Sequence, residues 1–260
     1  MLLSYLLSSS NSKSSVNMSS TNTTIVALIT GGNRGIGFEI ARQLGQQGIE
    51  ILIGSRNETR GKDAVEKLIN DHGVKAAACV QLDMQDQESI DRAVETVSRT
   101  YNKLDILVNN GGIYLDEPPP SALDIDMLRH TFDTNFFGVF RVTKAFLPLI
   151  KRSLNGGRIV NVSSALGSFR SHELNQQNFH LAYSASKASL NMLTVQFAKE
   201  LKQTNIKVNS YAPGFTATEM TNYEGHSVEI GARSAVTLAT LPNDGPTGRF
   251  FAHDLSERGW

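Results

Sequence analysis

The sequence predicts an α/β fold in which a parallel sheet carries helices on both faces, and three features indicate this. Short apolar runs rich in β-branched residues alternate with segments whose apolar residues recur at helical spacing. The first run, at 25–29, leads directly into a glycine-rich turn and then a helix. Strands that alternate with helices need right-handed crossovers, which build a doubly wound parallel sheet, here of about seven strands.

The expected elements cover nearly the whole chain after residue 24. We expect strands near 25–29, 49–54, 76–82, 104–108, 157–162, 206–211 and 250–251. We expect helices from the glycine turn to about residue 48, and near 58–71, 87–101, 124–151, 183–203 and 228–241. No internal repeat or hinge-like linker interrupts this pattern, so residues 25–260 are predicted to form one domain.

The first 24 residues have a different composition. A short cluster of leucines at 2–7 precedes a serine- and asparagine-rich stretch. The cluster is too short for a membrane span and lacks the basic flank of a secretory signal. We expect a disordered tail that lies upstream of an alternative start at Met18, and an organelle-targeting leader is the competing interpretation.

The composition narrows the classes of function. The formal net charge of zero gives no electrostatic reason to expect nucleic acid or an anionic membrane as partner. Cys79 is the only cysteine, which excludes an internal disulfide and a cysteine-built metal site and favours a reducing, cytoplasmic location. The six histidines show no metal-ligand spacing, so no metal site is predicted.

The glycine-rich turn at 30–37 predicts a phosphate-binding loop. Glycines let the chain turn sharply and let a ligand approach the main chain. The helix that follows directs its unpaired N–H groups and positive dipole end at the turn, where a pyrophosphate fits. The spacing Gly-x-x-x-Gly-x-Gly differs from the common dinucleotide fingerprint, so packing alone is the alternative explanation.

Two arginines favour a phosphorylated dinucleotide. Arg56 lies just beyond the second strand, where a carboxylate would accept hydrogen bonds from the adenosine ribose, and an arginine pairs with a 2′-phosphate instead. Arg34, in the glycine turn, can reach the same phosphate. The pair favours NADP(H) over NAD(H); the alternative is that both are solvated surface charges.

Several polar residues stand at strand ends or inside helices. Asp83 follows the third strand and Ser164 the fifth, positions where ligands collect but where caps and turns are also common. Asn135 lies within an apolar helical segment, which by itself favours a satisfied buried amide. Tyr183 and Lys187 are four residues apart, so on a helix they face the same way.

Taken together, these motifs resemble the short-chain dehydrogenases/reductases, and the carbonyl-reductase-like members in particular. The shared elements are Thr-Gly-x-x-x-Gly-Ile-Gly at 30–37, Asp83, Asn-Asn-x-Gly at 109–112, Asn135, Ser164, Tyr-x-x-x-Lys at 183–187 and Pro-Gly at 213–214. The resemblance implies a single-domain Rossmann-type fold and hydride transfer between NADP(H) and a small carbonyl or alcohol substrate.

The resemblance also implies roles for single residues. Tyr183 is the general acid, Lys187 lowers its pKa and binds the nicotinamide ribose, Ser164 polarises the carbonyl, and Asn135 holds a water of a proton relay. Asp83 and Asn109 contact the adenosine half, and Pro213, Gly214 and Thr218 flank the nicotinamide. The full set of expected cofactor contacts is Gly31, Asn33, Arg34, Gly35, Ile36, Gly37, Arg56, Asp83, Met84, Asn109, Gly111, Tyr183, Lys187, Pro213, Gly214, Thr216 and Thr218.

The sequence departs from the family pattern in two places. Gly111 replaces the usual alanine of Asn-Asn-Ala-Gly, which is expected to loosen that turn. An insert at 169–178 lengthens the chain between Ser164 and Tyr183 and is expected to shape specificity or block assembly. A 3-oxoacyl-thioester or steroid-type reductase is the alternative enzyme, and a non-catalytic dinucleotide-binding regulator the alternative class; the chain is expected to be a monomer or homo-oligomer.

Overall fold

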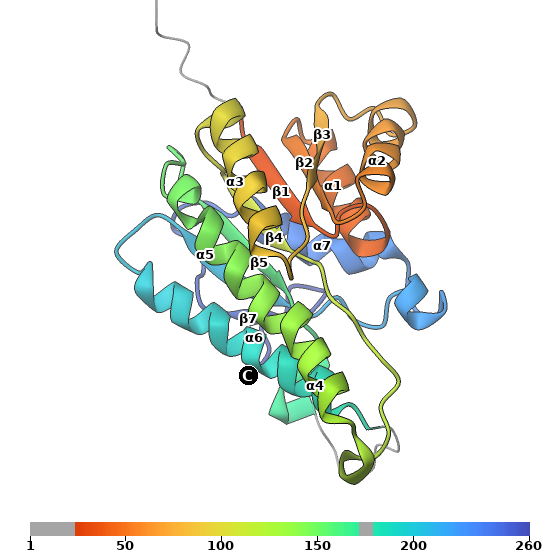
Figure 1. Cartoon of the computed structure of the whole chain (residues 1–260). Helices are drawn as coiled ribbons and strands as arrows, with labels where there is room; N and C mark the ends of the chain where they lie inside the picture. Colours follow the sequence, from red (N-terminus) through yellow and green to blue (C-terminus); the bar gives the residue numbers. More distant parts are fainter. Residues whose placement is uncertain (1–23, 172–178) are drawn as a thin grey trace, which may run out of the picture.

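The computed structural model describes residues 24–171 and 179–260, and its centre is one parallel sheet (Figure 1). The strands are β1 (Val26–Thr30), β2 (Glu50–Ser55), β3 (Ala77–Gln81), β4 (Ile106–Asn109), β5 (Arg158–Val162), β6 (Lys207–Tyr211) and β7 (Phe250–Phe251). They pair in the order β3-β2-β1-β4-β5-β6-β7. The predicted doubly wound fold is confirmed.

The helices connect these strands in sequence order. They are α1 (Gly35–Gln46), α2 (Glu58–Asn70), α3 (Gln87–Tyr101), α4 (Ile125–Phe132), α5 (Val139–Ile150), α6 (Leu181–Glu200) and α7 (Val228–Ala239). Short 3-10 turns lie at Pro120–Ala122, Ala165–Gly167, Phe169–Ser171 and Glu219–Thr221. None of the helices in the described part of the chain is long and apolar enough to cross a membrane.

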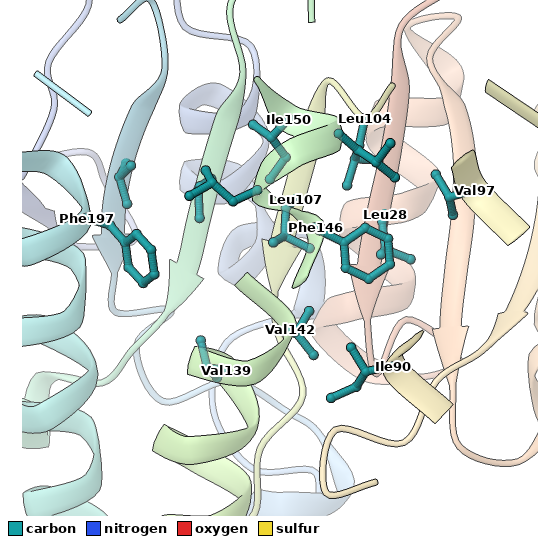
Figure 2. Packing of buried hydrophobic residues seen from close by; sticks show 14 of the residues in the cluster. Leu28, Ile90, Val97, Leu104, Leu107, Val139, Val142, Phe146, Ile150 and Phe197 are labelled. Carbon is teal, nitrogen blue, oxygen red and sulfur yellow. The ribbon is translucent and has the colours of Figure 1, made fainter. Parts of the chain in front are cut away.

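Each face of the sheet buries its own hydrophobic core. Side chains of α3, α5 and α6 pack on one face, and side chains of α1, α2 and α7 pack on the other. Figure 2 shows the first core, where Phe146 of α5 lies among Leu28, Leu107 and Ile90 from β1, β4 and α3. Strands covered on both faces are expected to be almost entirely apolar, as β1 is up to its last residue, Thr30.

One predicted helix, at 124–151, is divided in the structure. A π-helical segment, Asp133–Gly138, separates α4 from α5. The apolar pattern continues through it, so periodicity alone predicted one helix. Pi-helical turns are rare and often occur at functional sites, and this one contains Asn135. The other predicted elements lie within about three residues of the observed ones.

The strand order creates a crevice at the carboxyl edge of the sheet. The chain moves outward from β1 to β3 and then returns to place β4 on the other side of β1. In open α/β sheets, ligands bind at such a switch point, outside the carboxyl ends of the strands. The glycine turn after β1 and the Asn109–Gly112 segment after β4 therefore lie at the expected ligand site.

Phe146 tests how much stability the α5 core contributes. It is fully buried, so we expect Phe146→Ala to lower the free energy of unfolding by about 3–5 kcal/mol. Phe140 is a matched control on the same helix, since it is 40% exposed; Phe140→Ala should cost about 1 kcal/mol or less. Urea denaturation measures both, and equal losses would contradict this packing.

Candidate active site

The glycine turn after β1 is shaped by backbone conformation and by close contact. Gly31 and Gly35 have φ values of +61° and +55°, which favour glycine. Gly37 has no such φ, but a Cβ there would lie 2.4 Å from Asn110 Nδ2 and 2.7 Å from the Gly31 carbonyl. Asn110 Nδ2 donates to the carbonyls of Thr30 and Gly31 and so ties the turn to the end of β4.

The N-terminus of α1 faces a loop from the other half of the sheet. Its N-cap residue, Arg34, makes no capping bond with its side chain, and α1 has no acidic residue in its first turn. A Cβ on Gly35 would meet Thr218 Cγ2 at 3.5 Å, which places the loop after β6 beside the glycine turn. Arg34 forms an ion pair with Glu219 of that loop, and both side chains are largely exposed.

Two more of the predicted cofactor contacts, Asn33 and Ile36, lie on the glycine turn. Asn33 and Ile36 are partly buried, and Ile36 packs against the core on the α1 side of the sheet. The turn thus offers free backbone N–H groups, a positive helix end and two arginines to an anion, since Arg56 lies exposed just beyond β2. This donor set fits a phosphorylated dinucleotide.

The side chains of Asp83 and Asn109 both form hydrogen bonds within the protein. Asp83 Oδ1 accepts from the Gln85 N–H, which makes it a turn residue after β3. Asn109 Nδ2 donates to Thr143 Oγ1 and Asn161 Oδ1, so this side chain points into the core. The expected contacts of both residues with the adenosine half stay predictions; the Asn109 Oδ1 is buried and has no hydrogen-bond partner within the described residues.

Met84 explains the glycine at position 111. A Cβ on Gly111 would lie 2.6 Å from Met84 Sδ, so the methionine occupies the space of an alanine methyl group. The Gly111 N–H also donates to Thr30 Oγ1 at 3.0 Å. The expectation that Gly111 loosens the turn is therefore wrong, because Met84 and Thr30 hold it in place.

The loop after β6 is held by its own threonines. Thr216 is buried, and its Oγ1 donates to the carbonyls of Pro213 and Gly214. Gly214 has a φ of +78°. Thr221 Oγ1 accepts from the Thr218 N–H and donates to the Thr216 carbonyl. The loop is thus internally ordered at the carboxyl edge, as a segment flanking a bound cofactor would need to be.

Ser164, Tyr183 and Lys187 come together at the end of β5. The Ser164 hydroxyl lies close enough to Tyr183 to lower its pKa by hydrogen bonding, and Ser164 Oγ also accepts from the Leu166 N–H at 3.2 Å. Lys187, one turn further along α6, places Nζ 5.6 Å from the centre of the Tyr183 ring and donates to the Val162 carbonyl at 2.9 Å. The neighbouring Ser163 donates to Asn191 instead, which makes Ser164 the serine that faces the tyrosine.

The pKa of Tyr183 moves opposite to the expectation. We expected Lys187 to lower it, but burial raises the pKa of Tyr183 to about 12, and the hydrogen bond from Ser164 offsets this only in part. Burial also lowers the pKa of Lys187 to about 8. The protein therefore holds a protonated phenol beside a lysine that is charged at neutral pH but close to its midpoint.

Asn135 is a satisfied buried amide in the π-helical segment. Its Oδ1 accepts from the Ile113 N–H, and its Nδ2 donates to the Ile113 carbonyl and to Ser186 Oγ. A Cβ on Gly112 would lie 3.2 Å from Asn135 Oδ1 and 3.5 Å from Lys187 Nζ, so the amide and the ammonium flank the same glycine. Its role in a proton relay stays a prediction, with both side-chain donors already used.

Sequence reasoning missed two residues that organise the site. Asn110 joins the glycine turn to β4, and Ser186 links Asn135 to α6 because its Oγ also donates to the Tyr183 carbonyl. Both lie inside motifs the sequence had already marked, at 109–112 and 183–187, so only their roles were missing.

Part of the 169–178 insert, residues 172–178, lies outside the described residues. No cluster of three or more potential metal ligands occurs in the described ranges.

Comparison with known proteins identifies the family. The sequence model described as "short chain dehydrogenase" matches residues 25–229. The chain is 36% identical to a (+)-neomenthol dehydrogenase of Arabidopsis thaliana over 87% of this chain and 95% of that protein. It is also 39% identical to the 3-oxoacyl-[acyl-carrier-protein] reductase FabG of Aquifex aeolicus over 75% of each chain.

A solved structure agrees with this assignment. The NADPH-bound carbonyl reductase from chicken fatty liver superposes with a TM-score of 0.79 at 25% identity, over 91% of this chain and 99% of that one. The chain belongs to the short-chain dehydrogenase/reductase family, as the sequence motifs predicted. It is therefore an oxidoreductase of that class.

The lowered pKa of Lys187 predicts how stability depends on pH. Between about pH 8 and its ordinary value of 10.5, the unfolded chain binds more protons at this lysine than the folded one, so stability rises with pH. Relative to Lys187→Met, the wild-type free energy of unfolding should rise from pH 8 to 9.5, by at most about 1.4 kcal/mol per pH unit. Urea melts at several pH values measure this difference.

The exposed Lys202 provides the control for this measurement. Lys202→Met makes the same substitution at the surface and corrects for the loss of one lysine. A constant difference between wild type and Lys187→Met would show that Lys187 keeps its ordinary pKa.

Proposed function

We propose that this enzyme reduces a small ketone or aldehyde with NADPH, the reverse being oxidation of the alcohol. The observation that carries this proposal is that Ser164, Tyr183 and the buried Lys187 meet at the end of β5, with Lys187 Nζ 5.6 Å from the centre of the Tyr183 ring. Tyr183 would supply the proton and Ser164 a polarising hydrogen-bond donor to the same carbonyl oxygen. The reductase names of the relatives support the same class of reaction.

The glycine turn and its neighbours would hold the cofactor. The backbone N–H groups at the start of α1 would bind the pyrophosphate, and Arg34 and Arg56 the 2′-phosphate. The ion pair of Arg34 with Glu219 does not prevent this, because an exposed ion pair contributes only about 0–1 kcal/mol. When bound, NADPH supplies the hydride to the carbonyl carbon.

The protein's own groups manage the proton. Ser164 and Tyr183 donate hydrogen bonds to the carbonyl oxygen and hold it against the hydride donor. Tyr183 gives its hydroxyl proton to the oxygen as negative charge develops there, which completes the alcohol. The Lys187 ammonium stabilises the resulting phenolate, and the backbone carbonyl of Val162 fixes its position.

A 3-oxoacyl-thioester reductase is the second candidate. The 39% identity with the Aquifex reductase favours it, although that alignment covers less of the chain than the neomenthol dehydrogenase does. The two candidates use the same proton donor, so a screen of simple ketones and aldehydes against 3-oxoacyl thioesters separates them. We favour the small carbonyl.

The proposal extends to where the enzyme is located and how it assembles. We place the enzyme in the cytoplasm because its single cysteine, Cys79, suits a reducing compartment. We expect a monomer or a homo-oligomer acting on a small molecule, with no nucleic-acid or membrane partner. Fractionation of cells and light scattering of the purified protein measure these properties.

Tyr183→Phe tests the proposed proton donor. The substitution removes one hydroxyl and keeps the ring, so we expect the NADPH dissociation constant to stay within about threefold. Ketone-dependent NADPH oxidation should fall by a factor of at least about 10³, since the reaction loses its acid. The absorbance of NADPH follows the rate, and normal turnover would rule out this role.

Arg56→Asp tests the choice of cofactor. A carboxylate there would repel the 2′-phosphate and accept from a ribose hydroxyl, so we expect the ratio of kcat/KM for NADPH over NADH to fall at least about tenfold. Arg60, exposed on the first turn of α2, is the matched control. Arg60→Asp makes the same charge change and should alter this ratio by less than about threefold.

If both variants shift the ratio equally, the effect is general electrostatics and Arg56 is not a phosphate ligand. If neither shifts it, Arg34 or another group selects the cofactor.

A further inference from the structure

Helix α6, which carries Tyr183 and Lys187, begins without a cap of its own. Its N-cap residue is His180, whose side chain makes no capping hydrogen bond to the helix. The first N–H groups of a helix have no partner within the helix and need an acceptor from elsewhere. A buried helix start without one would be destabilised.

The acceptor is Glu117, from the loop between β4 and α4. Its Oε2 accepts from the Ala182 N–H at 2.7 Å, and its Oε1 accepts from the Tyr183 N–H at 2.8 Å. These are the second and third residues of α6, the two positions that an N-cap serine or aspartate satisfies. The carboxylate also meets the positive end of the helix dipole. Glu117 therefore caps α6 from 65 residues away in the chain.

The same loop also holds the Tyr183 side chain. The ring of Tyr114 packs edge-on against the ring of Tyr183, with centres 5.1 Å apart and planes at 87°. The Tyr114 hydroxyl pairs with His180 Nδ1 at 3.0 Å. Helical side chains lean toward the N-terminus, so the place of the Tyr183 phenol depends on the geometry of this first turn.

We propose that Glu117 is a positioning residue for catalysis. By holding both the Ala182 and Tyr183 N–H groups, it fixes the first turn of α6 and so holds the Tyr183 hydroxyl at Ser164. This inference rests on the proposed function, in which Tyr183 donates the proton. Its physical basis is that a small misplacement of a reacting group lowers the rate while cofactor binding, made at α1, stays intact.

The test compares three variants by two independent measurements. In Glu117→Ala we expect kcat for ketone reduction to fall at least about tenfold, with the NADPH dissociation constant within about twofold of wild type. Hydrogen exchange of the segment 180–187 should become about tenfold faster, as expected when a cap is lost. Glu117→Gln keeps one acceptor oxygen and should give intermediate values in both measurements.

Asp116 offers the matched control. It is a neighbouring, exposed carboxylate in the same loop whose side chain forms no hydrogen bond or ion pair within the described ranges; like Glu117, its charge raises the pKa of Tyr114. Asp116→Ala should leave kcat and exchange unchanged. If Asp116→Ala and Glu117→Ala lower kcat equally, loop charge and not capping is responsible, and the proposal is wrong.

The two measurements separate this proposal from the proposed function. Faster exchange in Glu117→Ala with an unchanged kcat would show a cap that does not position Tyr183, and would overturn the inference. An unchanged rate of hydrogen exchange at 180–187 in Glu117→Ala would show that Glu117 does not cap α6, and would also overturn the inference. If the wild type reduces no carbonyl, the proposed function fails, while the exchange of 180–187 still decides whether Glu117 holds the first turn. Should Glu117→Ala not fold, the graded response of Glu117→Gln decides the same questions.

Discussion

The hydrogen bond from Lys187 to the carbonyl of Val162 is the contact on which the site depends. Lys187 is only 4% exposed, and this bond fixes its ammonium at the end of β5, one turn along α6 from Tyr183. A buried charge needs such a partner, because desolvation otherwise favours the neutral amine. The sheet thus positions the charge through its backbone, and α6 positions the phenol relative to that charge.

Burial gives this arrangement its chemical character. It raises the pKa of Tyr183 and lowers that of Lys187, so in the protein alone the Tyr183 phenol stays protonated at neutral pH. A proton donor of this kind needs further positive charge nearby before its anion becomes stable. The oxidised nicotinamide carries such a charge, which would couple proton transfer to the presence of cofactor. The protein's contribution is then placement, and the cofactor completes the electrostatics.

Much of the fold could be predicted from the sequence because its signals are local. The helix at 87–101 and the turn at 30–37 follow from apolar periodicity and glycine spacing over a few residues. The division of the 124–151 helix could not be predicted, since a π-helical turn keeps the apolar pattern and here serves to place Asn135. The direction of the Tyr183 pKa also escaped prediction, because it depends on burial by residues distant in the chain.

The same distinction applies to the site: some of its residues belong to short sequence motifs, and others act through contacts between segments far apart in the chain. Ser164, Tyr183 and Lys187 lie in short motifs, whereas Glu117 acts on α6 from a loop with no recognisable pattern. Met84 was expected to contact the cofactor, and its packing against Gly111 could not be predicted. Asn109 illustrates the opposite case, a motif residue whose side chain the core uses for its own hydrogen bonds. Residue type and spacing thus predicted which groups gather at the crevice, but not which atoms remain available there.

The most direct test of the account is an ultraviolet titration of Tyr183, followed as tyrosinate absorbance in the protein alone and in its complex with NADP⁺. The difference between wild type and Tyr183→Phe isolates this one phenol. The account predicts ionisation near pH 12 in the protein alone and a pKa lower by at least about two units in the complex. An unchanged pKa in the complex would contradict it, because the charge of the oxidised nicotinamide would then have no effect on this phenol.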